Sequence, residues 1–260
     1  MKLLLAIAIL FLIACNNEEK KETVIMPGAY MMIIQSIKSS TIDTTYHTLQ
    51  QLKIYTGEYM MYANFYARDS SSGFGIGSYD AEKDTVTEHV IYNASDSMKN
   101  DTPHSYKLLI VKTDSGYRQV INDMESQGQK IILTEEYKSV GTPIISPLDG
   151  VWKELKTYYV KGTDTTRYNT TQFKAYFGSY YIWGHTYSDS TRVNHTGMGF
   201  GKFTMTGANK MKESCITSSY YQVRGQDNDL DLEMNGTDEF KQTITYKNGG
   251  KSIEIYQRLK

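Results

Sequence analysis

The sequence predicts an all-β protein built from two tandem eight-stranded antiparallel up-and-down barrels, and three observations support this. The 260 residues include 22 Tyr, many Thr and Val and only 4 Pro, and aromatic and β-branched side chains fit a pleated surface. Short strand-like runs alternate with turn signals, while no capped stretch repeats apolar residues at helical spacing. An internal duplication divides the chain into two similar halves.

Two glycine-alternating stretches mark the duplication. GFGIG at 73–77 returns 124 residues later as GMGFG at 197–201. Landmarks on both sides repeat at offsets of 121 to 125, which makes chance similarity an unsatisfactory explanation. We expect one unit over residues 28–139 and a second over 150–260, joined by a linker at 140–149 that contains two prolines. Prolines stop a sheet from running through the linker, so two separate folding units are predicted.

The first unit contains eight strand-like runs bounded by turn signals. Eight sequential strands joined mainly by tight turns close most economically into a barrel, because closure leaves no bare edge. A β-sandwich is the alternative. The expected strands are 29–37, 48–56, 58–66, 73–80, 84–92, 105–113, 117–124 and 129–138.

The glycine-alternating stretch is expected to be the fourth strand of each barrel. Gly73, Gly75 and Gly77 are spaced by two, so all three face one side of a strand. A stripe without side chains allows close approach and sharp coiling. The spacing differs from that of a dinucleotide-binding loop and no helix start follows it, which disfavours phosphate binding.

The N-terminus has the form of an export signal. Met1 and Lys2 precede an apolar run at 3–14 that is too short for a comfortable membrane span. The run ends in LIAC at 12–15, which resembles the lipobox of bacterial lipoproteins; a plain secretory signal with a chance Cys is the alternative. The resemblance implies removal of residues 1–14 and acylation of Cys15, and two acyl chains give stable membrane attachment.

The residues after the acylated Cys predict where the protein is anchored. Asn16, in place of Asp, implies the outer membrane of a Gram-negative cell. Residues 15–27 are mostly polar and are expected to form the lipidated tether. Whether the globular part faces the periplasm or the exterior is left open.

The repeated motifs resemble lipocalin-like domains, members of the calycin group of small β-barrels. The shared features are an early Gly-x-aromatic, at Gly28 to Tyr30 and Gly150 to Trp152, a Lys-containing second strand, the glycine-rich fourth strand and a Glu in the fifth. The chain lacks the terminal helix and the disulfide of secreted animal lipocalins, so their ligands are not carried over. The resemblance implies barrels whose interior is either filled or holds one small ligand.

Charged residues recur at equivalent positions among apolar neighbours, which suggests that they point inward. An unpaired buried ion costs several kcal/mol, so we predict that Lys53 lies near Glu88 and Lys174 near Glu213, or that Tyr hydroxyls hold them. Such a pair either fixes the register of the barrel, or lies at the surface, or orients a ligand. The candidate ligand-binding residues are Lys53, Tyr55, Glu88, Lys174, Tyr176 and Glu213.

The sequence offers little support for catalysis, metal or cofactor binding, or nucleic-acid binding. Net charge is −1 without a basic block, and no catalytic motif occurs. His185 and His195 have no recognisable ligand spacing, and the acidic alternation at 227–233 is interpreted as a solvated strand edge. Cys215 is expected to be buried, and with Cys15 lipidated no disulfide is possible.

The predicted function is non-enzymatic binding of a small apolar or amphipathic molecule in one or both barrels of a membrane-anchored lipoprotein. The alternative is a structural or interaction module with filled barrels that contacts an envelope protein. The volume of the barrel interiors distinguishes these hypotheses.

Overall fold

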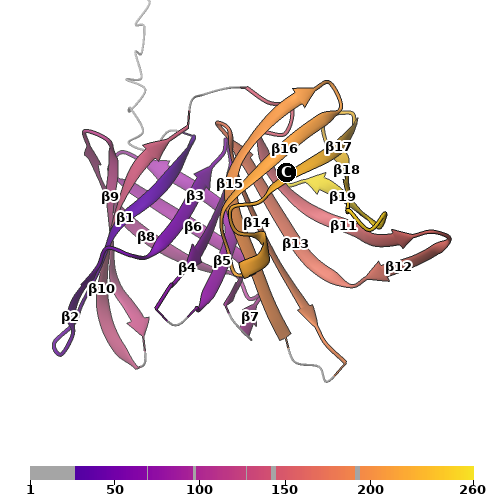
Figure 1. The fold of residues 1–260 in the computed structure, drawn as a ribbon. Coiled ribbons are helices and arrows are strands. Elements are labelled where there is room, and N and C mark those ends of the chain that lie inside the picture. Colours follow the sequence, from indigo (N-terminus) through magenta and orange to yellow (C-terminus); the bar gives the residue numbers. More distant parts are fainter. Residues whose placement is uncertain (1–26, 69, 96–97, 127, 142–144, 191–193) are drawn as a thin grey trace, which may run out of the picture.

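The computed structural model describes residues 27–68, 70–95, 98–126, 128–141, 145–190 and 194–260. In these ranges the chain forms two closed eight-stranded antiparallel barrels in sequence order, with one short 3-10 helix (Figure 1). The all-β fold class and the up-and-down barrels are therefore confirmed, and the sandwich alternative is wrong.

In the first barrel each strand pairs with the next, and β1 and β10 pair to close the ring. All eight strands expected from the sequence are present. The barrel strands are β1 (Gly28–Lys38), β3 (Gln50–Tyr55), β4 (Tyr59–Phe65), β5 (Ser72–Glu82), β6 (Thr85–Ser95), β8 (His104–Thr113), β9 (Gly116–Ser126) and β10 (Gln129–Val140).

The second barrel repeats this order and closes through β11 and β19. Its strands are β11 (Gly150–Lys161), β13 (Thr170–Phe177), β14 (Tyr180–Ser188), β15 (Asn194–Gly207), β16 (Lys210–Ser218), β17 (Asp227–Asn235), β18 (Glu239–Thr245) and β19 (Lys251–Arg258). The 3-10 helix Tyr221–Val223 lies in the connection between β16 and β17.

Three short strands were not predicted. β2 (Asp43–Tyr46) and β12 (Asp164–Tyr168) pair with the second half of β1 and of β11, whose first halves pair with β3 and β13. β7 (Met98–Asn100) pairs with the end of β6. The second half of each first strand therefore pairs with the last strand of its barrel on one side and forms a hairpin with the short strand on the other, which is clearest for β11 and β12 in Figure 1.

The glycine stripe of β5 and β15 faces the barrel interior and makes room for aromatic rings. A Cβ atom on Gly75 would lie 2.5 Å from the Tyr62 ring, and one on Gly199 would lie 2.6 Å from the Trp183 ring. Where β5 continues to Gly77, the ladder to β6 shifts register, and a Cβ there would lie 2.1 Å from the His89 carbonyl oxygen. The fourth strand is therefore closely approached and bent, as predicted.

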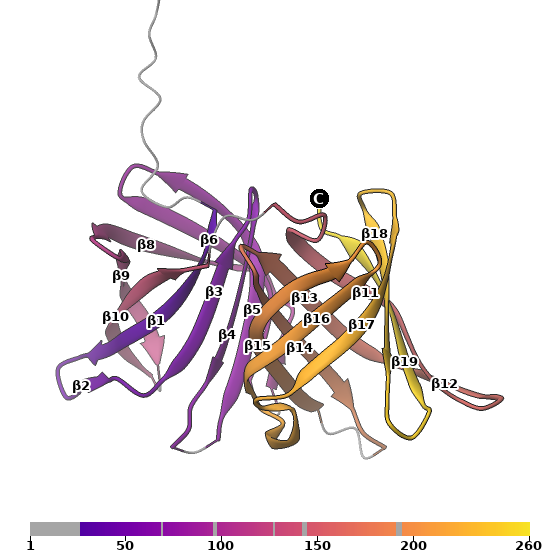
Figure 2. The same ribbon diagram turned by 45° about the horizontal axis from the view of Figure 1, so that its top comes forward.

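The outward faces of β3, β4 and β5 pack against those of β13, β14 and β15, so the two barrels lie side by side (Figure 2). Leu52, Ile54 and Ala175 are fully buried there. Side-chain hydrogen bonds between Tyr92 and Thr186 and between Thr217 and Gln50 cross the contact. The contact comprises Ala29, Leu52, Ile54, Met61, Ala63, Phe65, Phe74, Ile76, Tyr92, Ala94, Val151, Phe173, Ala175, Tyr180, Ile182, Met198 and Phe200, called here the interbarrel core.

The sequence predicts two separate folding units, but the interbarrel core joins the two barrels through a shared apolar contact. The sheets are separate, as the linker prolines predict, but the barrels share one continuous apolar contact. The sequence shows an apolar face opposite Lys53 and Lys174, and the structure shows that the other barrel covers it. Strands buried on both faces follow from this packing.

Phe74→Ala is expected to lower the free energy of unfolding by about 3–5 kcal/mol, because it opens a cavity in the interbarrel core against Gly184. Chemical denaturation followed by circular dichroism measures this loss. Val111→Ala is the control, since Val111 is 56 % exposed and its truncation should change stability by less than about 0.5 kcal/mol. Equal effects of the two variants would contradict a stabilising role for the contact.

Candidate functional site

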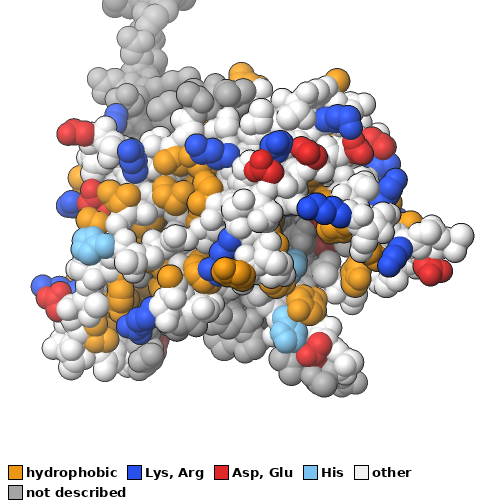
Figure 3. All heavy atoms as spheres, in the orientation of Figure 1, with side chains coloured by type: hydrophobic (Ala, Val, Ile, Leu, Met, Phe, Trp, Pro, Cys, Tyr) orange, Lys and Arg blue, Asp and Glu red, His pale blue; other side chains and the backbone are white. Residues whose placement is uncertain are grey.

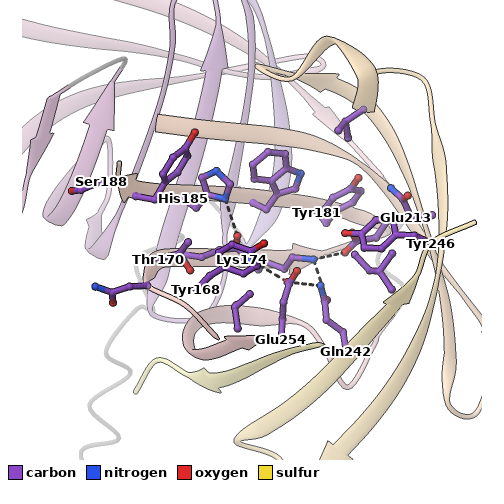
Figure 4. A pocket seen from close by; sticks show the side chains of 18 residues that line it. Tyr168, Thr170, Lys174, Tyr181, His185, Ser188, Glu213, Gln242, Tyr246 and Glu254 are labelled. Atoms are coloured by element: carbon purple, nitrogen blue, oxygen red, sulfur yellow. Dashed lines mark hydrogen bonds and ion pairs between the residues drawn. The ribbon is translucent and has the colours of Figure 1, made fainter. Parts of the chain in front are cut away.

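The second barrel contains a cavity of about 550 Å³ (Figure 4). This volume is within the range of small-molecule sites in proteins. The aromatic wall of the cavity consists of Tyr168, Tyr181, Trp183, Tyr187 and Tyr246. Its polar floor consists of Lys174, Glu213, Gln242 and Glu254. The cavity therefore combines apolar area with a small number of converging polar groups.

Both predicted ion pairs are present. Lys53 Nζ lies 2.9 Å from Glu88 Oε1, and Lys174 Nζ lies 2.9 Å from Glu213 Oε1. All four side chains are at most 6 % exposed. Tyr176 also donates a hydrogen bond of 2.6 Å to Glu213, and Tyr55 makes the equivalent bond to Glu88. Each carboxylate thus accepts one hydrogen bond from a lysine and one from a tyrosine, which offsets the free-energy cost of burying its charge.

The candidate residues are divided between the two barrels, and only two of them reach the cavity. Lys174 and Glu213 line it, while Tyr176 supports Glu213 from behind. Lys53, Tyr55 and Glu88 lie in the interior of the first barrel, in the midst of its packed side chains.

The ion pairs belong to a longer hydrogen-bond network that sequence reasoning missed. In the second barrel, Lys174 donates to Gln242 over 3.1 Å and Gln242 donates to Glu254 over 2.7 Å. Tyr256 and Gln172 also donate to Glu254. Figure 4 shows Lys174 between Glu213 and Gln242, with Glu254 at the far end of the chain of bonds.

The first barrel repeats this network. Lys53 donates to Gln119, and Gln119 donates to Glu135 over 2.6 Å. Tyr137 donates to the same carboxylate over 2.7 Å and accepts a hydrogen bond from Gln51. The sequence contains a signal for this network, because Gln119 and Gln242 begin matching segments of the repeats.

Burial keeps the tyrosines of these networks in their neutral, donating form. Desolvation raises the pKa of Tyr55 and Tyr176 well above the usual range, and the adjacent Glu88 and Glu213 carboxylates raise it further. The same two causes act on the pKa of Tyr137 and Tyr256, beside Glu135 and Glu254. Each phenol therefore remains a hydrogen-bond donor at neutral pH.

Equivalent positions in the two barrels explain why a cavity forms in the second. Leu49 and Leu133 contribute to the apolar interior of the first barrel. The register of the strands places Thr170 and Ser252 at the same positions in the second barrel. Tyr106, which faces Glu88, is replaced by Asn228, which faces Glu213. Thr170 and Asn228 line the cavity, and Ser252 contacts Glu254 of its floor, so smaller side chains at these three positions leave space beside the polar floor.

His185 lies at one side of the cavity and is neutral. Burial lowers the pKa of its imidazole to about 4. The ring nitrogens contact Gln172 Oε1 at 3.1 Å and the Tyr220 hydroxyl at 2.7 Å. Since the Gln oxygen only accepts, the imidazole donates from Nδ1 and accepts from Tyr220 at Nε2. His185 therefore ties the connection between β16 and β17 to the barrel.

His195 and Cys215, which the sequence analysis considered as a metal ligand and a nucleophile, lie in surroundings that do not support these roles. His195 contacts Asp189 at 2.9 Å, and among the described residues no group of three or more His, Cys, Asp or Glu could hold a metal ion. Cys215 is buried, and burial raises the pKa of its thiol to about 11, which disfavours a nucleophilic role.

The acidic alternation at 227–233 is solvated, but it does not lie on a sheet edge. β17 pairs with β16 and with β18, so the barrel has no edge at this strand. The acidic side chains point outward and pair with Lys210, Lys212 and Lys241 on the neighbouring strands. Figure 3 shows Lys, Arg, Asp and Glu side chains interspersed over this face.

One arrangement of catalytic residue types occurs on the outer face of the first barrel. The His89 ring contacts Ser105 Oγ and Asp80 Oδ2, both at 2.9 Å. The side chains of His89 and Asp80 are 42 % and 84 % exposed. Water surrounds these groups on a convex surface, so the arrangement gives no support for an enzyme.

The predicted signal peptide and Cys15 lie outside the described residues, so acylation remains a prediction. Within the described ranges, no helix has the length and apolar character needed to cross a membrane.

The chain matches no protein-family model, and no curated protein is significantly similar to it. The barrels are consistent with a lipocalin-like fold, and a fold shared by many proteins does not by itself define a function.

Lys174→Met is expected to lower the free energy of unfolding by about 3–5 kcal/mol, because Glu213 keeps a buried charge without a cation. Adding Glu213→Gln to this variant should recover part of the loss, since the uncompensated charge is removed. Denaturant unfolding of the single and double variants measures both effects.

Lys210→Met is the control for this experiment, because Lys210 pairs with Asp231 at the exposed surface and its loss should change little. A double variant less stable than Lys174→Met would contradict the assigned role of the buried pair.

Proposed function

We propose that the protein is a non-catalytic, membrane-anchored lipoprotein that binds a small amphipathic molecule in its second barrel. The observation that carries this proposal is the cavity of about 550 Å³ with an aromatic wall and a polar floor. Rings supply apolar area for the body of a ligand, and fixed polar groups orient its head. The floor residues are already held by one another, so a ligand meets a preformed surface.

The first barrel supports a structural role. Its interior holds the apolar side chains of Tyr30, Met60, Leu108 and Ile121, together with Leu133. This packing supports the hypothesis of a filled barrel, but only for the first barrel. In the proposed division of roles, the first barrel braces the second through the interbarrel core and the second binds the ligand.

The chemistry of the cavity supports binding over catalysis. Its ionised groups are engaged in a pair and a hydrogen-bond network, its imidazole is neutral and tied at both nitrogens, and the nearby thiol of Cys215 has a raised pKa. General acid or base catalysis needs a group that is poised near the working pH and within reach of the substrate. Glu154 has a pKa raised to about 7, but its side chain does not belong to the cavity lining.

The anchor is part of the same proposal. LIAC at 12–15 and the polar residues after it support acylation at Cys15, and Asn16 supports attachment to the outer membrane. Two acyl chains would keep the barrels at a membrane surface. A ligand reservoir of amphipathic molecules would then be close to the cavity.

Decanol, a neutral amphiphile, should change the fluorescence of Trp183, which lines the cavity and is one of only two Trp residues. Thr170→Leu combined with Ser252→Leu should abolish the change, because it restores at both positions the leucine found in the first barrel. A fluorescence titration of the wild type and this variant measures binding.

Thr204→Leu is the matched control for this titration, because Thr204 is exposed on β15. Trp152→Phe should keep the signal, since Trp152 is fully buried away from the cavity lining. Unchanged decanol binding after the cavity is filled would contradict the proposed site.

Cys15→Ser is expected to release the protein from the membrane fraction of a Gram-negative host, because the acylated residue is lost. Fractionation and labelling with a radioactive fatty acid measure attachment. A wild-type protein that takes up no label would contradict the proposed lipoprotein anchor.

A further inference from the structure

Two residues of β11 distinguish the cavity end of the second barrel from the same place in the first. Both first strands carry a bulge at equivalent positions, so their registers can be compared directly. Met32, opposite Tyr137, corresponds to Glu154, opposite Tyr256. Gln35, opposite Glu135, corresponds to Thr157, opposite Glu254 in the second barrel. We call Glu154, Thr157 and Glu254 the acidic end of the cavity.

These replacements leave oxygen acceptors with too few donors. In the first barrel, Gln35 donates to Glu135 Oε1 over 2.9 Å. Thr157 is too short to repeat this bond, and among the described residues Glu254 Oε1 accepts one hydrogen bond, from Ser252 at 3.3 Å. Within the described part of the chain, the buried Glu154 Oε1 and Thr157 Oγ1 have no hydrogen-bond partner. Buried polar atoms in native proteins are normally paired.

The acidic end also has an excess of negative charge. Lys174 is the cation of the cavity lining and is paired with Glu213. The hydrogen bonds to Glu254 come from the neutral side chains of Gln172, Gln242, Ser252 and Tyr256. Glu154 accepts one hydrogen bond of 2.6 Å from Thr170, a residue of the cavity lining. Two carboxylates thus share this end without a cation among the described residues.

We propose that the ligand of the second barrel carries an ammonium group, bound at the acidic end through Glu254 and Thr157 with Glu154 behind the wall. This proposal rests on the proposed binding function and specifies its ligand class. An ammonium supplies several N–H donors to acceptor oxygens and a positive charge to paired carboxylates. The aromatic wall favours the same ligand, since ring faces attract cations and pack against an apolar body.

The ionisation of Glu154 makes binding depend on pH. Burial raises the pKa of Glu154 to about 7, opposed by the hydrogen bond from Thr170 and assisted by the negative charge of Glu254. Tyr256, whose pKa is raised by burial and further by the charge of Glu154, stays neutral. In the cavity lining, His185 has a pKa of about 4 and Lys174 is paired with Glu213. An ammonium favours the ionised carboxylate, and Glu154 is increasingly ionised as pH rises through about 7. Affinity for an alkylammonium is therefore expected to increase over this interval.

Calorimetric titration of the full chain with decylammonium, decanol and decanoate tests the proposal. We expect decylammonium to bind about tenfold more tightly than decanol at pH 8, equal to about 1.4 kcal/mol, and decanoate to bind most weakly. From pH 6 to pH 8 the affinity for decylammonium should rise while that for decanol stays constant.

Glu154→Met installs the residue of the first barrel and Glu154→Gln retains the shape of the side chain. Either variant should lower the affinity for decylammonium towards that of decanol, remove its rise with pH and leave decanol binding unchanged. Glu233→Met, on the exposed face of β17, is the matched control and should leave all three affinities unchanged.

The outcomes separate the two proposals. If decanol binds as tightly as decylammonium, or decanoate binds most tightly, the ammonium inference is overturned and the binding function stands. If none of the three amphiphiles binds, the binding function itself fails, and the ammonium inference fails with it.

Discussion

Burial of the same strands on both faces is the constraint on which the rest of the structure depends. In most small barrels the outward face is solvated, and the interior alone supplies the apolar core. Here Leu52 and Ile54 are buried outside the first barrel, against Phe173 and Ala175 of the second. Much of the apolar burial is therefore supplied between the barrels. This allows the interiors to contain an ion pair and a polar network without losing the packed contact that stabilises the chain.

The repeated network gives each barrel the same polar framework, and the two interiors differ around it. Lys, Tyr, Glu and Gln side chains retain their bonding pattern in both copies. Apolar and amide side chains beside the framework in the first barrel become Thr, Ser and Glu in the second. A satisfied network keeps strand positions fixed while neighbouring side chains change. The cavity thus results from side chains that differ between the two repeats. The hydrogen-bond network that both repeats share stabilises the barrel around it.

Most of the fold could be predicted from the sequence, because its signals are local or repeated. Strand alternation, turn residues and the duplicated glycine stripe predict eight strands per barrel, and recurrent charges among apolar residues predict the pairs of Lys53 with Glu88 and Lys174 with Glu213. The interbarrel core was missed because the sequence pattern shows only that the outward face of a strand is apolar. It does not show which part of the protein covers that face. The cavity was missed because volume depends on several distant side chains at once, such as Thr170 and Ser252. The acidic end required the bulged register of β11, which residue spacing does not reveal.

The interbarrel core has one further property, which concerns symmetry. Strand β3 faces β13, β4 faces β14 and β5 faces β15, so each strand meets its own counterpart from the other repeat. A contact made by the same patch on both partners is isologous, the form taken by twofold homodimers. The central part of the contact therefore has, within one polypeptide, the pairing of equivalent strands that a symmetric dimer would have. Covalent fusion keeps the two halves at a fixed ratio of one to one, and it permits what identical subunits cannot have, namely one half with a cavity and one without.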